Sequence, residues 1–157
     1  MSSLPFIFQA IRELVASPVA GGLTPDAGSF GGVQVARARY SFATDGGVIG
    51  PITPALTVSL PAGAILVGGI VHVRDAVLAP AGSATVAIGT TAGSSASALL
   101  AATAKATLSA NAVLPLVPTN AIPVRLTATG SVNFTVATAA LTAGIIDAWI
   151  FFLPAVP

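Results

Sequence analysis

The clearest pattern in the chain is the alternation of apolar and polar positions that is typical of β-strands. Residues 33–42 alternate, with Val35, Arg37 and Arg39 on one face. Apolar runs bounded by turn residues follow, and we predict strands over residues 48–53, 55–60, 65–78, 83–90, 121–128, 131–138 and 144–153. Strands at this spacing predict an all-β fold, a jelly-roll-like antiparallel β-sandwich. The pattern leaves an immunoglobulin-like strand order open.

A different period governs the first section. In residues 2–17 apolar residues recur every three or four positions, which predicts a short amphipathic helix with Arg12 and Glu13 on its other side. Residues 19–32 are interrupted by Gly and Pro and are typical of a linker. We therefore predict two parts, an N-terminal arm with its linker over residues 1–32 and a β-sandwich domain over residues 33–157.

A lone helix of about a dozen residues is marginal in water, so the predicted helix needs a surface to lie on. It packs either on its own domain or in a groove of a neighbouring protein. An extended segment over residues 5–9, added to the edge of a partner's sheet, is a variant of the second case.

One interval departs from the strand pattern. Residues 92–108 are rich in Ala and Ser and predict a long loop with a short helix. Leu99 and Leu100 in this interval either plug an open end of the core or belong to a functional loop.

The composition limits the classes of function. The 15.3 kDa chain is 54% hydrophobic and only 7% charged, whereas soluble domains carry roughly 25% charged residues. Such a thinly charged surface predicts burial against other chains in an assembly. A net charge of +1 with scattered basic residues excludes a nucleic-acid groove. Every long uncharged stretch is broken by Gly, Pro, Ser or Thr, so we expect no membrane partner.

The sequence offers no convincing catalytic or metal-binding set. The chain has no cysteine, and His72 is its one histidine. No nucleophile elbow, phosphate loop or paired-carboxylate spacing is present, so we expect no enzyme, catalytic residue, metal or cofactor. On an extended strand His72 and Arg74 share a face while Asp75 points the other way. We expect His72, Arg74 and Trp149 to make contacts at a sheet face or an interface between subunits.

Four short segments carry a resemblance to a known class of protein. They are Leu60-Pro61-Ala62-Gly63-Ala64-Ile65, Gly82-Ser83-Ala84-Thr85-Val86-Ala87-Ile88-Gly89, Leu99-Leu100-Ala101-Ala102-Thr103-Ala104 and Leu141-Thr142-Ala143-Gly144. In this order they resemble capsid decoration (cement) and head-fibre proteins of tailed bacteriophages, over roughly residues 33–153. Those proteins are β-sandwiches on the outside of the head, commonly trimers, and the resemblance implies no catalytic residue.

The resemblance implies a structural virion protein that decorates the outer surface of the capsid and bridges its subunits. The expected partners are the major capsid protein and further copies of this chain in a homotrimer. We expect the arm to contact the capsid through Phe6, Ile7, Phe8, Ile11 and Leu14. Two alternatives stay open, a head-fibre or tail-associated module that binds host surface glycan, and a non-viral structural or adhesin subunit.

Overall fold

The computed structural model describes residues 32–80, 83–92, 98–118 and 124–155. The chain divides into two units, Met1–Gly31 and Gly32–Pro157, and the described residues belong to the second. The predicted helix over residues 2–17 and the proposed capsid contacts Phe6, Ile7, Phe8, Ile11 and Leu14 lie outside the described residues. The helix therefore stays a prediction.

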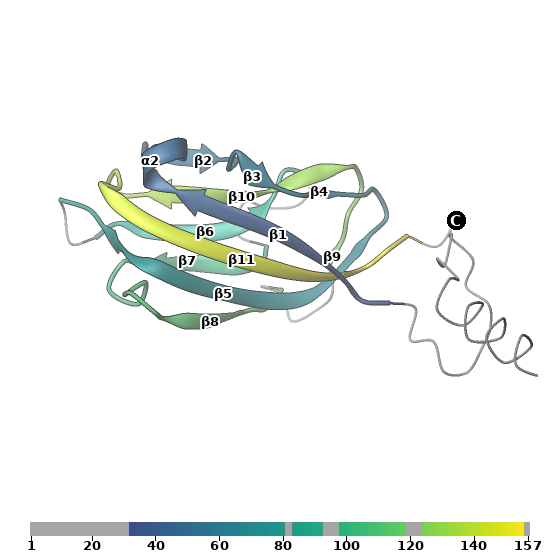
Figure 1. Cartoon of the computed structure of the whole chain (residues 1–157). Helices are drawn as coiled ribbons and strands as arrows, with labels where there is room; N and C mark the ends of the chain where they lie inside the picture. Colours follow the sequence, from purple (N-terminus) through teal and green to yellow (C-terminus); the bar gives the residue numbers. More distant parts are fainter. Residues whose placement is uncertain (1–31, 81–82, 93–97, 119–123, 156–157) are drawn as a thin grey trace, which may run out of the picture. The chain divides into compact units, whose positions relative to one another are not determined.

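The described residues form two facing antiparallel sheets (Figure 1). The first sheet has the order β3 (Leu56–Thr57), β1 (Gln34–Ser41), β11 (Ala143–Leu153), β5 (Ile65–Leu78) and β8 (Val113–Leu116), with β9 (Val124–Arg125) also paired to β5. The second has the order β2 (Gly50–Ile52), β10 (Gly130–Ala137), β6 (Thr85–Thr90) and β7 (Leu100–Ala104), with β4 (Ser59–Leu60) paired to β10. A single helical turn, α2 (Phe42–Asp45), follows β1.

The strand pairing identifies the sandwich as a jelly roll. Leaving aside the two-residue strands, the pairs nest inside one another along the chain, as β1 with β11, β2 with β10, β5 with β8, and β6 with β7. Two four-stranded sheets with this nested pairing make up a jelly roll. The predicted fold class is confirmed, and the strand order settles the alternative that the pattern had left open.

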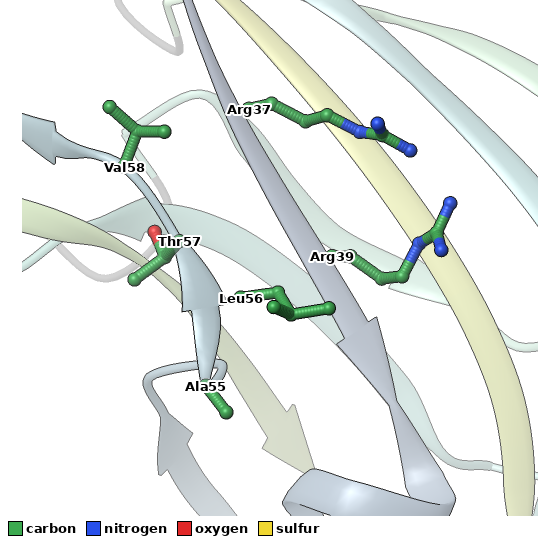
Figure 2. Close-up of a pocket in the computed structure, with 6 residues that line it drawn as sticks. All are labelled: Arg37, Arg39, Ala55, Leu56, Thr57 and Val58. Carbon is green, nitrogen blue, oxygen red and sulfur yellow. The ribbon is translucent and has the colours of Figure 1, made fainter.

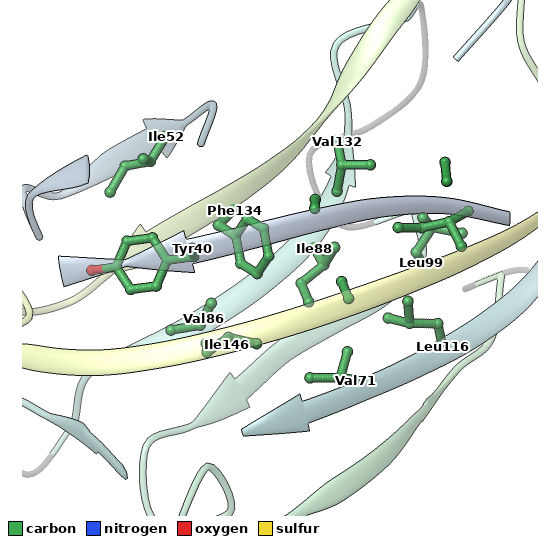
Figure 3. Packing of buried hydrophobic residues seen from close by; sticks show 14 of the residues in the cluster. Tyr40, Ile52, Val71, Val86, Ile88, Leu99, Leu116, Val132, Phe134 and Ile146 are labelled. Carbon is green, nitrogen blue, oxygen red and sulfur yellow. The ribbon is translucent and has the colours of Figure 1, made fainter. Parts of the chain in front are cut away.

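The core lies between the two sheets and is lined by the inward face of each strand. On β1 Ala36, Ala38 and Tyr40 are buried, with Ala36 and Ala38 fully inaccessible. On β10 the inward residues are Val132, Phe134 and Val136, again at every second position. Figure 3 shows Val132 and Phe134 of β10 between the sheets, near Val86 and Ile88 of β6 and Ile146 of β11. The alternation seen in the sequence is therefore the alternation between core and surface.

Tyr40 closes the core beside α2. Its ring centroid lies 5.7 Å from that of Phe134, and its hydroxyl donates a 2.7 Å hydrogen bond to the carbonyl oxygen of Gly46. Burial, with a smaller effect of the negative charge of Asp45, raises the pKa of Tyr40 to about 12. The tyrosine thus fills the apolar interior while its polar end is satisfied by the turn after α2.

Several predicted elements need correction. The loop predicted over residues 92–108 contains β7 in its described part, and no helix lies in residues 98–108. Leu99 is fully buried, and its backbone N–H donates a 3.0 Å hydrogen bond to Ile88. An Ala-rich segment has weak strand propensity, and pairing with β6 overrides it.

Other differences concern short edge elements. The strand predicted over residues 55–60 is split into β3 and β4, which belong to different sheets. Strand β8 was not predicted because it contains Pro115, which cannot donate to a ladder and is confined to edge strands such as this one. Strand β11 begins at Ala143, one residue before the predicted start of that strand.

Candidate functional site

The outward face of the first sheet carries an ionic cluster of Arg37, Arg39 and Asp147, together with His72 and Trp149. We call the outward side chains of β3, β1, β11, β5 and β8 the outer face. Two rows cross it from strand to strand. One row pairs Arg39 with Asp147, Asp147 with His72, and His72 with Val113.

The second row runs parallel to the first. It pairs Arg37 with Trp149, Trp149 with Ile70, and Ile70 with Pro115. Most of these residues are flanked along their strands by core residues, and Ile70, Val113 and Pro115 are themselves exposed, so both rows lie on the surface side.

Asp147 lies at the centre of an ionic cluster. Its carboxylate accepts two hydrogen bonds from Arg39, at 2.7 Å from Nε and 2.9 Å from Nη2. A third, at 3.3 Å, comes from Nη2 of Arg37. The Asp147 side chain is 3% exposed, whereas that of Arg37 is 52% exposed. The bidentate contact with Arg39 is the geometry that guanidinium and carboxylate groups prefer.

The two arginines determine the charge state of this carboxylate. Burial alone would raise the pKa of Asp147, but the hydrogen bond and charge of Arg39, with the charge of Arg37, outweigh it and hold that pKa below its usual value. The contact with Asp147 in turn raises the pKa of Arg39. The cluster is therefore fully ionised at neutral pH and carries one surplus positive charge.

Arg37 is held in place by an aromatic ring. Its guanidinium carbon lies 5.6 Å from the centroid of Trp149, the residue opposite it on β11. This is the range of a cation–π interaction. The contact positions Arg37 while leaving half of its side chain exposed to solvent.

A groove lies beside the arginines, on the surface over the paired strands β1 and β3. Its volume is about 340 Å³, and its lining residues are Arg37, Arg39, Ala55, Leu56, Thr57 and Val58. Figure 2 shows the guanidinium groups extending from β1 over β11, with Leu56 and Val58 on the other side. The walls are therefore mostly aliphatic, because the stems of the arginines face the groove and their charges lie beyond it.

Large apolar side chains surround the ionic cluster on the outer face. Leu56 is 64% exposed, Val35 55%, Ile70 41% and Val113 64%. The outward positions of the second sheet differ, since on β6 and β10 Ala87 and Asn133 are buried and Thr85 and Thr135 are half-buried. An exposed apolar patch of this extent is typical of a protein interaction site.

The predicted contact residues fall partly on this face. His72 and Trp149 lie on neighbouring strands of it and are both half-buried. Arg74 and Asp75 are both exposed, which corrects the expectation that Asp75 points away from the face of His72. A register shift between β5 and β11 inserts Arg74 as an extra residue and places Asp75 opposite Ile145.

Sequence reasoning missed the centre of the site. Arg37 and Arg39 were placed on one face, but Asp147 lies 108 residues beyond Arg39 in the sequence. Only the pairing of the first long strand with the last brings them together. The sequence did contain one signal, because Asp147 lies inside an otherwise apolar strand. A carboxylate that is buried in such a strand needs a positively charged or hydrogen-bonding partner.

The described ranges offer no cluster of metal ligands. No group of three or more His, Asp or Glu side chains in them is placed to hold a metal ion. Nor does this part of the chain contain a helix long and apolar enough to span a membrane.

Comparison with solved structures places the fold among chains of phage capsids. A chain of the acid-stable capsid of Helicobacter pylori bacteriophage KHP30 aligns with a TM-score of 0.54 and 17% identity, over 79% of this chain and 90% of that one. A chain of the Ralstonia phage GP4 capsid gives 0.53 and 20%, over 79% and 86%. A chain of the cyanophage Pam1 capsid asymmetric unit gives 0.53 and 22%, over 78% and 85%.

All three similar chains come from phage capsids. No protein-family model matches this chain, and no curated protein matches it. Identities of 17–22% show a shared fold, and the fold by itself does not assign a function.

Proposed function

We propose that this chain is a structural protein of a phage virion that attaches to the outside of the capsid and bridges its subunits. The observation that carries the proposal is the similarity of the fold to chains of three phage capsids, over most of both chains. The exposed apolar outer face and the scarcity of charge support it, because both suit a protein that is used in an assembled state.

The proposed mechanism is binding alone. A protein that binds the assembled shell, and not its separated subunits, stabilises the shell by mass action. The apolar residues of the arm, Phe6, Ile7, Phe8, Ile11 and Leu14, are proposed to contact neighbouring capsid subunits. The linker over residues 19–32 would span up to about 45 Å when extended, enough to reach across a joint between subunits. We further propose that three copies of this chain associate as a homotrimer on the shell.

Shell binding by the full chain tests the attachment. Ile11→Asp places a charge among the apolar positions of the predicted helix, and we expect it to reduce occupancy at least tenfold on stripped shells of the parent phage in a sedimentation assay. Gln9→Asp is the matched control, because residue 9 lies on the opposite side of a helix. Wild-type chain that fails to sediment with shells would refute the proposed function.

Two further measurements complete this test. Deleting residues 1–20 is expected to abolish or sharply weaken binding while the far-ultraviolet spectrum keeps its strand signal. Light scattering of the free protein is expected to give about three times the 15.3 kDa chain mass. A stable monomer at high concentration would remove the trimer from the proposal.

The glycan-binding alternative gains no support from the described residues. Sugar sites usually offer aromatic rings for stacking, whereas residues 92–108 contain no aromatic residue and the groove on the outer face is lined by none. We therefore do not propose it.

A further inference from the structure

The outer face presents a broad apolar surface with a positive centre and no partner within the described residues. We propose that it binds a protein of different sequence, whose surface is apolar and brings a carboxylate to Arg37. This inference rests on the proposed function, because in a virion that protein is the shell subunit beneath this chain. It adds a second attachment surface to the proposed contact through the arm.

The size of the face suits a protein partner. Five strands at a spacing of about 4.8 Å span about 24 Å, and the eight residues of β1 extend about 26 Å. The product, about 600 Å², is an upper limit because β3 has two residues and β8 has four, and it is of the same order as the roughly 800 Å² that each partner contributes to a stable interface.

The charges of the face specify what the partner carries. Arg39 and Asp147 satisfy each other through two short hydrogen bonds. Arg37 has only a 3.3 Å contact to the same carboxylate, and its side chain is 52% exposed. Covering this guanidinium with purely apolar groups would leave a charge without a partner. A carboxylate from the partner would instead make a charge-assisted contact with its remaining N–H groups.

The same charges argue against a second copy of this chain as the occupant. Pairing the face with itself about a two-fold axis would bring two surplus positive charges into one desolvated contact. The chain also has few carboxylates to offer, with five acidic residues in all. Of the three described, Asp147 is bound to arginines, Asp45 accepts hydrogen bonds from the backbone N–H groups of Ser41 and Ala55, and Asp75 is exposed next to the positive charge of Arg74. Asp75 is therefore the one described carboxylate that a second copy could offer to Arg37.

This reasoning revises the role expected for His72 and Trp149. Both lie in the rows that cross the outer face, so they belong to the contact with the shell rather than to a contact between copies. The groove over β1 and β3 lies directly beside Arg37. It would take an apolar side chain of the partner next to the carboxylate, which gives the contact a defined orientation.

The test uses the full chain and stripped shells of the parent phage. Val113→Asp adds a charge at a 64% exposed position on the outer face, and Val48→Asp makes the same change at a 70% exposed position in the loop between α2 and β2. We expect Val113→Asp to weaken shell binding at least tenfold and Val48→Asp to leave it within twofold. Equal effects of the two variants would overturn the inference.

The charge is tested at Arg37. Arg37→Glu is expected to weaken binding at least tenfold and Arg37→Lys by less, because lysine keeps the charge and loses the planar contact. Melting temperatures of all variants, measured without shells, separate lost binding from lost folding. Wild-type chain that binds shells while Arg37→Glu binds equally well would overturn this inference and leave the proposed function intact.

Two readouts identify other occupants. If Val113→Asp converts an oligomer of the free protein to monomers, a second copy covers the face and the inference is wrong. The fluorescence of Trp149, the single tryptophan, reports cover by the chain's own arm. A shift to longer wavelength in the free Ile11→Asp variant would show that the arm lies on the face, and would also overturn the inference.

Discussion

Replacement of Asp147 by Asn tests the view that the ionic cluster is fixed by one buried carboxylate. The change keeps the shape of the side chain but removes its charge and presents an amide N–H₂ to two arginines. Asp147 is 2% exposed, so its lost hydrogen bonds are not replaced by water at that position. We expect the free energy of unfolding to fall by about 2 kcal/mol.

The size of this loss follows from the exposure of the partners. Removing one member of a fully buried ion pair costs about 3–5 kcal/mol, because the remaining charge stays buried. Here the side chains of Arg37 and Arg39 are 52% and 28% exposed, so both can be hydrated after the change. The loss is therefore smaller than for a fully buried pair.

Urea unfolding followed by circular dichroism measures the loss. A change of about 2 kcal/mol lowers the midpoint by about 1 M urea when the slope is about 2 kcal/mol per molar. Circular dichroism is preferred to fluorescence. Trp149 contacts Arg37 of the cluster, so the substitution itself could change the tryptophan fluorescence of the folded protein.

The two arginines provide the internal control. Arg39→Met removes the bidentate contact and Arg37→Met only the 3.3 Å contact, so the first should destabilise the protein more and lose more of its effect in an Asp147→Asn background. An Asp147→Asn midpoint equal to that of the wild type would refute the reasoning, and so would equal effects of the two arginine changes.

Four shorter predictions test the rest of the description. The lowered pKa of Asp147 contributes stability that is present above the pKa of about 3.9 in the unfolded chain and is lost as pH falls through the folded value; acid unfolding of Asp147→Asn should lack this component. Tyr40 is the single tyrosine, and its ultraviolet titration in the folded protein should have a midpoint near 12 rather than 10; its raised pKa predicts stability that falls as pH rises above 10, and this fall should be absent in Tyr40→Phe. Phe134→Ala should lower the free energy of unfolding by about 3–5 kcal/mol in urea titration, whereas a loss below about 1 kcal/mol would show that the described core packing is wrong. Gly69→Ala should unfold at a lower temperature than the wild type, because a Cβ at this position would overlap the carbonyl oxygen of Trp149; an unchanged melting temperature would contradict the pairing of β5 with β11.

The long strands of the fold could be predicted because their patterns match their environment. Strand β5 has the predicted bounds, Ile65–Leu78, and β1, β6, β10 and β11 each begin and end within two residues of their predicted ends. These strands bury one face, so burial and alternation give the same signal. Strands β7 and β8 were missed because small residues and proline hide the strand pattern where a neighbour supplies the pairing.

The candidate site could be predicted only in part, for a reason of topology. The predicted residues His72 and Trp149 lie on the outer face, because an outward position is a property of one strand. The ionic cluster depends on two strands. They are the first and the last in the sequence of the sandwich domain, and they pair side by side in one register. Local pattern contains no information on that register, so Asp147 could not be matched with Arg37 and Arg39.

The position of this cluster has a physical consequence for folding and for binding. A slip of one residue between β1 and β11 would turn Asp147 toward the core, where its charge would have no partner. The pair Arg39 and Asp147 therefore favours the native register in a chain whose strands carry few other charged residues. The same pair leaves Arg37 as the exposed charge of an apolar surface. A surface of apolar residues alone would bind many partners in many orientations, whereas a single held charge favours the orientation that supplies a carboxylate.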